Sequence, residues 1–189
     1  MAMMLVLVTT VAAVAASIAR AGDSHMTPVV ALYAGDNDGV TVAYPGSVLR
    51  IDPNSGAATP LALPVPVTRI DAFSGGRAGT LYLAAAGSGI WISDDSGASW
   101  RAGGDGLPSG NVRALTAHAS DRQTVYAYVA EDGIYRSEDT GRSWKLMDAG
   151  PEDMTGPFVH TDMPGRMQTG WLFAATERGI SRSMDCFCP

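Results

Sequence analysis

The chain has 189 residues, of which 46% are hydrophobic and 17% charged, and it is rich in glycine and proline. This composition excludes a disordered chain and indicates one domain with a packed core and many turns. The net charge of −6 and the lack of any Lys/Arg cluster argue against a nucleic-acid partner, because phosphate binding needs grouped cations.

The chain opens with a stretch, residues 1–19, that carries no charged side chain. A helix of this length, at about 1.5 Å per residue, can just cross a hydrocarbon core of about 30 Å. We predict a transmembrane anchor over residues 1–21, with its residues 1–19 in contact with the lipid bilayer, followed by a domain over residues 22–189. The alternatives are a signal peptide cleaved before Gly22 and a buried soluble helix.

Both leading interpretations export the rest of the chain to a compartment where disulfides form. We therefore expect a bacterial cell membrane protein with a single-pass anchor and its domain on the periplasmic side. If the segment is a cleaved signal, the protein is secreted or periplasmic instead.

An eight-residue phrase occurs twice, as SDDSGASW at 93–100 and as SEDTGRSW at 137–144. The surrounding residues match as well, so that 80–100 corresponds to 124–144, with hydrophobic residues alternating at a period of two. Weaker copies occupy 46–61 and 170–189. A repeat of this period, rich in strand-forming residues, is typical of four-stranded propeller blades.

The fold class predicted from this repeat is all-β. We expect a partial or small β-propeller of about four blades, each a four-stranded antiparallel sheet, preceded by one N-terminal apolar helix. A strand near 29–33 could complete the fourth blade and close a four-bladed ring. We favour an incomplete or partner-completed propeller over that closed ring.

The motif Ser-x-Asp-x-Gly-x-[Ser/Thr]-Trp resembles the Asp-box, or BNR repeat. That repeat is found in β-propellers of sialidases, of sortilin-type receptors and of a photosystem II assembly factor. The resemblance implies that the motif residues have structural roles: Ser93, Asp95, Gly97 and Trp100 in one copy, Ser137, Asp139, Gly141 and Trp144 in the next, and Ser183 and Asp185 in the last.

Tight-turn chemistry accounts for each position of the phrase. Gly97 and Gly141 supply the positive φ that a tight hairpin needs, and the aspartates and serines are placed to bond to backbone groups of the same turn. The tryptophans supply apolar surface that fixes the turn against the blade. Acid/base catalysis or calcium binding by the aspartates is the alternative, but carboxylates on successive blades are too far apart for hydrolysis.

Other candidate chemistry is sparse. Sialidases with this repeat carry Arg-Ile-Pro before the first box, whereas LRIDP at 49–53 interrupts that string. Arg50, Arg69 and Arg113 could still face a common funnel. The histidines, His25, His118 and His160, lack metal-ligand spacing, although the last two occupy matching places on successive blades.

Two further features lie towards the C-terminus. Cys186 and Cys188 are the only cysteines, and we expect them to form a disulfide or a link to a partner rather than a metal site. The segment 151–170, with three methionines, reads as a surface loop between the third and fourth blades, where a partner contact is an alternative.

We therefore expect a non-enzymatic scaffold for protein–protein interaction, with no cofactor and no metal. The specific hypothesis is an accessory subunit, or an assembly or stability factor, bound to subunits of a membrane protein complex, photosynthetic or respiratory by analogy with the resemblance. The alternative is a carbohydrate-binding protein or a sialidase-like glycoside hydrolase fragment that uses the propeller funnel.

Overall fold

The computed structural model describes residues 28–35, 39–108, 111–151, 153–162 and 170–183. The expected N-terminal helix of residues 1–21 lies outside these ranges, as do Asp185, Cys186 and Cys188. In the described part of the chain, no helix has the length and apolar character needed to cross a bilayer.

The described residues form 15 strands and a single short 3₁₀ turn, η1 (Arg77–Gly79). The all-β prediction is confirmed for them. The strands are β1 (Ala31–Ala34), β2 (Val40–Tyr44), β3 (Ser47–Ile51), β4 (Ala58–Pro60), β5 (Ile70–Gly75), β6 (Leu81–Ala85), β7 (Gly89–Ser93), β8 (Arg101–Gly103), β9 (Val112–Ala117), β10 (Val125–Val129), β11 (Gly133–Ser137), β12 (Lys145–Asp148), β13 (Met154–Thr161), β14 (Trp171–Thr176) and β15 (Gly179–Ser183).

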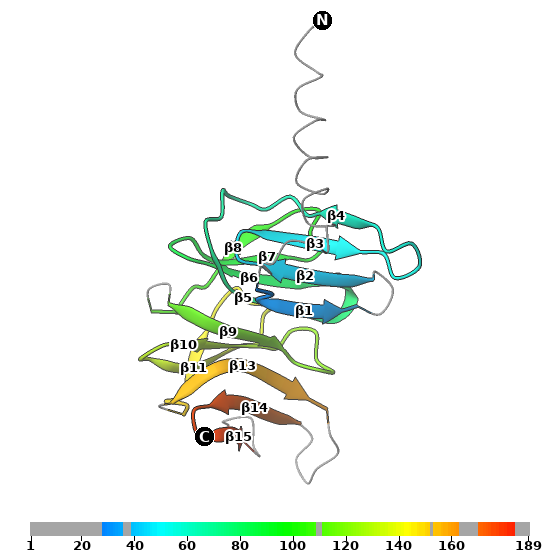
Figure 1. Ribbon diagram of the computed structural model, residues 1–189. Coiled ribbons are helices and arrows are strands. Elements are labelled where there is room, and N and C mark those ends of the chain that lie inside the picture. The colour runs from blue at the N-terminus through cyan, green and yellow to red at the C-terminus, as the bar shows by residue number, and fades with distance from the viewer. Residues whose placement is uncertain (1–27, 36–38, 109–110, 152, 163–169, 184–189) are drawn as a thin grey trace, which may run out of the picture.

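The strands assemble into four antiparallel sheets, each made from consecutive strands. Blades 1, 2 and 3 are the four-stranded sheets β1–β4, β5–β8 and β9–β12, and blade 4 is the sheet β13–β15. In Figure 1, blade 1 lies at the top of the molecule and blade 4 at the bottom. The predicted propeller of four blades is confirmed, with three strands rather than four described in the last blade.

The structure excludes the alternative of a closed four-bladed ring and corrects one prediction. The strand β1 pairs with β2 as the innermost strand of blade 1, so it does not complete blade 4 and does not close a four-bladed ring. The segment 151–170, expected to be a loop, contains β13, whose residues pair with β14. Gly156 and Pro157 hid the strand, because such residues weaken a strand pattern.

Blades 2 and 3 each pack one face on the blade before them and the other face on the blade after them. We call the first the rear face of a blade and the second its forward face. In blade 3, Val125, Ala127 and Val129 lie on the rear face and pack against blade 2. Tyr126 and Tyr128 lie on the forward face and pack against blade 4. The predicted alternation with a period of two therefore places both faces of this blade in apolar joints.

Three apolar joints connect the four blades. The joint between blades 1 and 2 contains Ala43, Val48, Phe73, Leu81 and Leu83. The joint between blades 2 and 3 contains Tyr82, Ala84, Ile90, Ile92, Leu115, Val125, Ala127 and Trp144. The joint between blades 3 and 4 contains Tyr126, Tyr128, Ile134, Phe158, Leu172 and Ala174. Among the described strands, extensive contacts between blades join only consecutive blades.

The hairpin between the second and third strands sets the register of each blade. It closes at Ala85–Gly89 in blade 2 and at Val129–Gly133 in blade 3, but at Thr176–Gly179 in blade 4, where the loop is one residue shorter. Residues of β14 therefore lie one position away from where the sequence repeat places them. As a result Leu172 faces blade 3, as Leu81 and Val125 face their preceding blades.

Candidate functional site

The two repeated phrases form tight hairpins after β7 and β11. The Ser93 hydroxyl accepts the backbone N–H of Gly97 at 2.7 Å and donates to the Asp95 carboxylate at 2.8 Å. The same carboxylate accepts both the backbone N–H and the hydroxyl of Ser99. Gly97 has a φ of +86°, which an L-residue with a side chain rarely adopts. The Asp95 carboxylate is thus engaged within its own turn.

The second hairpin repeats these contacts. The Ser137 hydroxyl accepts the backbone N–H of Gly141 at 2.8 Å and donates to Asp139 at 2.7 Å. The Asp139 carboxylate accepts the backbone N–H and the hydroxyl of Ser143. Gly141 has a φ of +78°. In both turns the carboxylate bonds to its own loop, an arrangement that leaves it no role in a shared catalytic pair.

Each hairpin also contacts the preceding blade, which the sequence did not indicate. The carbonyl of Thr140 accepts a hydrogen bond from the Arg101 guanidinium at 2.8 Å. The backbone N–H of Trp144 donates to the carbonyl of Asp105 at 2.8 Å. In the first hairpin the guanidinium of Arg50 donates to the carbonyl of Ser96. The turns therefore fasten one blade to the next as well as closing their own hairpins.

The tryptophans of the phrases differ in their surroundings. Trp144 is buried, and its indole N–H donates to the carbonyl of Gly141 at 3.0 Å within the same turn. Trp100 is only half-buried, and its indole N–H donates at 2.8 Å to the carbonyl of Ala62, in the link between blades 1 and 2. Of these two indole N–H groups, that of Trp144 bonds within its own turn and that of Trp100 bonds outside it.

In the weak first copy, Asp52 organises the turn. The Asp52 carboxylate accepts the backbone N–H groups of Asn54 and Ser55, each at 2.8 Å. These bonds lower the pKa of Asp52 below its ordinary value. Asp52 occupies the position of the serine in the other copies, so a carboxylate takes over the acceptor role of that hydroxyl. In the fourth copy, Ser183 is buried at the end of β15.

The hairpin bonds predict a dependence of stability on acid. Hydrogen bonds from Ser99 hold the pKa of Asp95 at about 2. At Asp139 burial raises the pKa, but hydrogen bonds from Ser143 and Ser137 outweigh that effect and hold the pKa at about 2. Both values lie below the value of about 3.9 for an unperturbed aspartate. The stabilisation is therefore complete above about pH 4 and is lost as the pH falls towards 2.

We expect the thermal midpoint, followed by circular dichroism, to fall steeply between pH 4 and pH 2. A variant with both Asp95→Asn and Asp139→Asn should have a lower midpoint at pH 7 and a flatter profile below pH 4, because the titrating carboxylates are gone. An unchanged acid profile in that variant would contradict the assignment of the transition to these two turns.

A groove runs along the innermost strands of all four blades. It has a volume of about 810 Å³ and is lined by residues 29–34, 71–77, 113–119 and 156–160, which belong to β1, β5, β9 and β13 and their ends. We call it the inner-strand groove. Its apolar residues Val29, Leu32 and Val159 are exposed, and so are the guanidinium-bearing Arg77 and Arg113. Exposed apolar side chains gathered in a hollow are typical of a binding surface.

The acidic content of the inner-strand groove is low. Asp71 is the single acidic residue among those that line it. Its carboxylate pairs with Arg69, with 2.7 Å between Oδ1 and Nε. Arg113 lines the groove, whereas Arg50 is bonded to Ser96 and Arg69 to Asp71. The three arginines considered from the sequence thus do not converge on one funnel.

Two histidines meet at the joint between blades 3 and 4, as their matching places on successive blades suggested. The ring centroids of His118 and His160 are 3.8 Å apart. The Nδ1 atom of His160 accepts the backbone N–H of Ala119 at 3.0 Å, and Nδ1 of His118 accepts that of Asp121 at 2.9 Å. An accepting nitrogen carries no proton, so each neutral ring is protonated on Nε2. Both rings are fixed by backbone groups and support the wall of the groove.

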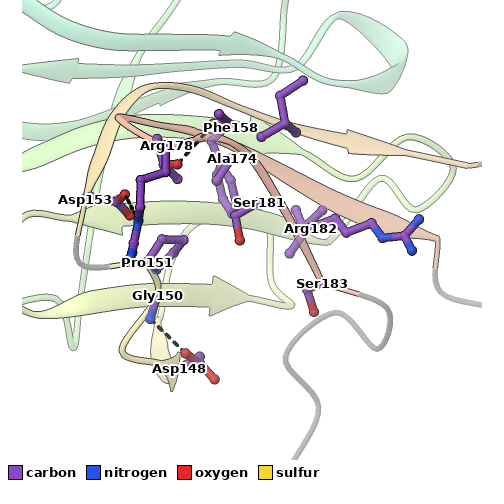
Figure 2. A pocket seen from close by; sticks show the side chains of 14 residues that line it. Asp148, Gly150, Pro151, Asp153, Phe158, Ala174, Arg178, Ser181, Arg182 and Ser183 are labelled. Carbon is purple, nitrogen blue, oxygen red and sulfur yellow. Dashed lines mark hydrogen bonds and ion pairs between the residues drawn. The ribbon is translucent and has the colours of Figure 1, made fainter.

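A second, smaller cavity of about 490 Å³ lies between the link from β12 to β13 and the strands of blade 4 (Figure 2). An ion pair between Asp153 and Arg178, at 2.7 Å, lies on one side of it, and Asp148 accepts the backbone N–H of Gly150 nearby. Within the described residues, no group of three or more side chains is arranged to bind a metal.

Comparison with known proteins agrees with the architecture. No family model matches the chain, and no curated protein matches it. A GH74 enzyme of Niastella koreensis superposes with a TM-score of 0.60 at 17% identity, over 80% of this chain and 26% of that one. YCF48 bound to D1 peptide gives 0.61 at 15% identity, over 83% and 50%.

The WD40 repeats of RRP9 give a TM-score of 0.57 at 14% identity, over 82% of this chain and 46% of that one. The chain therefore spans between about a quarter and a half of the length of these structures. Likeness at such identities shows a shared fold. The chain has the fold of the β-propellers.

Proposed function

We propose that the chain is a non-enzymatic protein–protein interaction module that holds a polypeptide segment in the inner-strand groove. The observation that carries this proposal is the groove itself, to which all four blades contribute their innermost strands. Each innermost strand is an edge strand of its sheet, and edge strands can bond to an extended chain through backbone groups. The exposed Leu32 and Val159 offer apolar contacts, and Arg77 and Arg113 offer charged ones.

The finer part of the proposal concerns location and partner. We propose that the blades are of the Asp-box type and that residues 1–21 tether them to a bacterial membrane, with the domain in the periplasm. The bound segment then belongs to a subunit of a membrane protein complex, photosynthetic or respiratory. The fold of YCF48, a protein captured with a D1 peptide, gives this choice its support by analogy.

A glycoside hydrolase is the second candidate, and the similarity to GH74 enzymes favours it. Glycosidases of the usual type need two carboxyl groups on opposite sides of the scissile bond, about 5 to 10 Å apart. The residues that line the inner-strand groove include one, Asp71, and Arg69 neutralises it. Release of reducing sugar from xyloglucan or sialosides, abolished by Asp71→Asn, would support the enzyme and overturn the interaction module.

The test of the interaction module is capture of a partner from detergent-solubilised membranes by the full chain. We expect the wild type to retain a membrane-complex subunit and a variant with Arg77→Glu and Arg113→Glu to lose at least about tenfold of it, because both exposed cations of the groove are reversed. Arg122→Glu is the matched control, since Arg122 is exposed but does not line the groove.

A photo-crosslinking residue at Val159 identifies the bound segment directly. Crosslinks to one peptide region of the captured subunit are the expected result. Recovery of the wild type as a lone monomer, or equal capture by the groove variant and the Arg122→Glu control, would contradict the proposal.

A further inference from the structure

The forward face of blade 4 repeats a surface that is buried in every other blade. The second residue of the third strand is Val48 in blade 1, Ile90 in blade 2 and Ile134 in blade 3. These three side chains are at most 2% exposed, because the following blade covers them. Their counterpart in blade 4 is Ile180, which is 80% exposed.

Other residues of this face agree. Phe173, the counterpart of Tyr82 and Tyr126, is half-buried, whereas those tyrosines are buried in joints. Phe173 pairs across the sheet with Val159, which is exposed. The forward face of blade 4 is therefore a joint surface, in residue type and position, without a blade on it among the described residues.

The rear face of blade 1 is the complementary case. Leu32 pairs with Val42 on the second strand, in the place where Phe73, Leu115 and Phe158 pair in the other blades. Those three residues are at most 6% exposed, because each packs on the preceding blade, whereas Leu32 is 65% exposed. The four blades form an arc with its two ends at the top and bottom of Figure 1, and an exposed apolar residue lies at each end, Leu32 on blade 1 and Ile180 on blade 4.

We propose that two copies of the chain associate head to tail, with the forward face of blade 4 of one copy packed on the rear face of blade 1 of the other. All three internal joints pair a forward face with a rear face, and a second copy offers both kinds at its ends. A twofold axis along the axis of the arc would make the two contacts identical and close a ring of eight blades.

The contact is expected to be weaker than an internal joint. Val42 and Leu49, at the centre of the rear face of blade 1, are already buried in the single chain. The accessible apolar part of that face is its inner rim at Leu32, so that each contact is smaller than the joints between blades. Closure of the ring by two contacts at once compensates for this, because the second contact forms within an existing complex.

Sedimentation velocity of the full chain in a mild non-ionic detergent tests the proposal. We expect a concentration-dependent dimer, weakened roughly tenfold or more by Ile180→Asp and by Leu32→Asp, because each places a charge in an apolar contact. Both side chains are largely exposed in the single chain, so the variants should keep the wild-type circular dichroism. Leu146→Asp, at a side chain 55% exposed on β12, is the matched control and should associate like the wild type.

Mixing the two variants separates a head-to-tail contact from a face-to-face one. In a mixture of Ile180→Asp and Leu32→Asp, the intact forward face of the Leu32→Asp copy meets the intact rear face of the Ile180→Asp copy. We therefore expect the mixture to associate more strongly than either variant alone. A wild type that stays monomeric, a Leu32→Asp variant that associates like the wild type, or a mixture no stronger than its components would each overturn the proposal.

Discussion

Replacing Tyr126 with alanine is expected to lower the free energy of unfolding by about 4 kcal/mol, the range found for large aromatic residues removed from a core. Tyr126 is 1% exposed at the joint between blades 3 and 4. Its ring stacks on His160 with 5.7 Å between centroids and meets the edge of Phe158 at 6.3 Å. The substitution removes both contacts and leaves a cavity between the two blades.

The loss should be local, because extensive contacts between the strands that the structure describes join only consecutive blades. Hydrogen exchange followed by mass spectrometry should show faster exchange in β13–β15, while β2 and β3 keep their protection. Tyr82→Ala is the matched control, since Tyr82 is the counterpart of Tyr126 in blade 2. It should loosen the joint between blades 2 and 3 instead. A uniform loss of protection over all blades in the Tyr126→Ala variant would contradict this picture.

The second large effect is expected from Ser137→Ala. The Ser137 hydroxyl is buried, accepts the backbone N–H of Gly141 and donates to Asp139. Its removal leaves the N–H of Gly141 buried without its acceptor, which costs about 2 kcal/mol. Because the carbonyl of Gly141 also accepts the N–H of Gly104, the joint to blade 2 should weaken as well. Chemical denaturation measures both effects as one change in the midpoint.

Ser143→Ala provides the comparison for that measurement. The Ser143 hydroxyl also bonds to Asp139, at 2.6 Å, but it is exposed, so water can replace the lost bond. We expect it to change stability by less than about 1 kcal/mol. Equal losses from the two substitutions would show that burial of the Ser137 hydroxyl contributes nothing to the turn.

The sequence predicted the blades because a repeat reports a structural unit directly. Alternation of residues such as Val125 and Tyr126 gave the two faces of a strand, and the turn glycines Gly97 and Gly141 have the positive φ that the hairpins require. These features are local, so they depend on neighbours along the chain and can be read without the fold.

Features that depend on distant parts of the chain could not be predicted. The inner-strand groove combines four strands that are far apart in the sequence, and its exposed residues Leu32 and Val159 look like ordinary strand residues there. The bond from Arg101 to the next hairpin spans a joint that no single repeat contains. The register of β14 depends on a loop that is one residue shorter, which a comparison by matching letters does not detect.

The restriction of contacts to consecutive blades also bears on how such a chain changes over evolutionary time. A tandem duplication or a deletion of one complete unit adds or removes a blade together with one joint, and leaves the remaining joints chemically as they were. Recombination between the similar segments around Ser93 and Ser137 would produce such events in frame. Chain length in this architecture can therefore vary in whole units, while partial units leave apolar surface open to water.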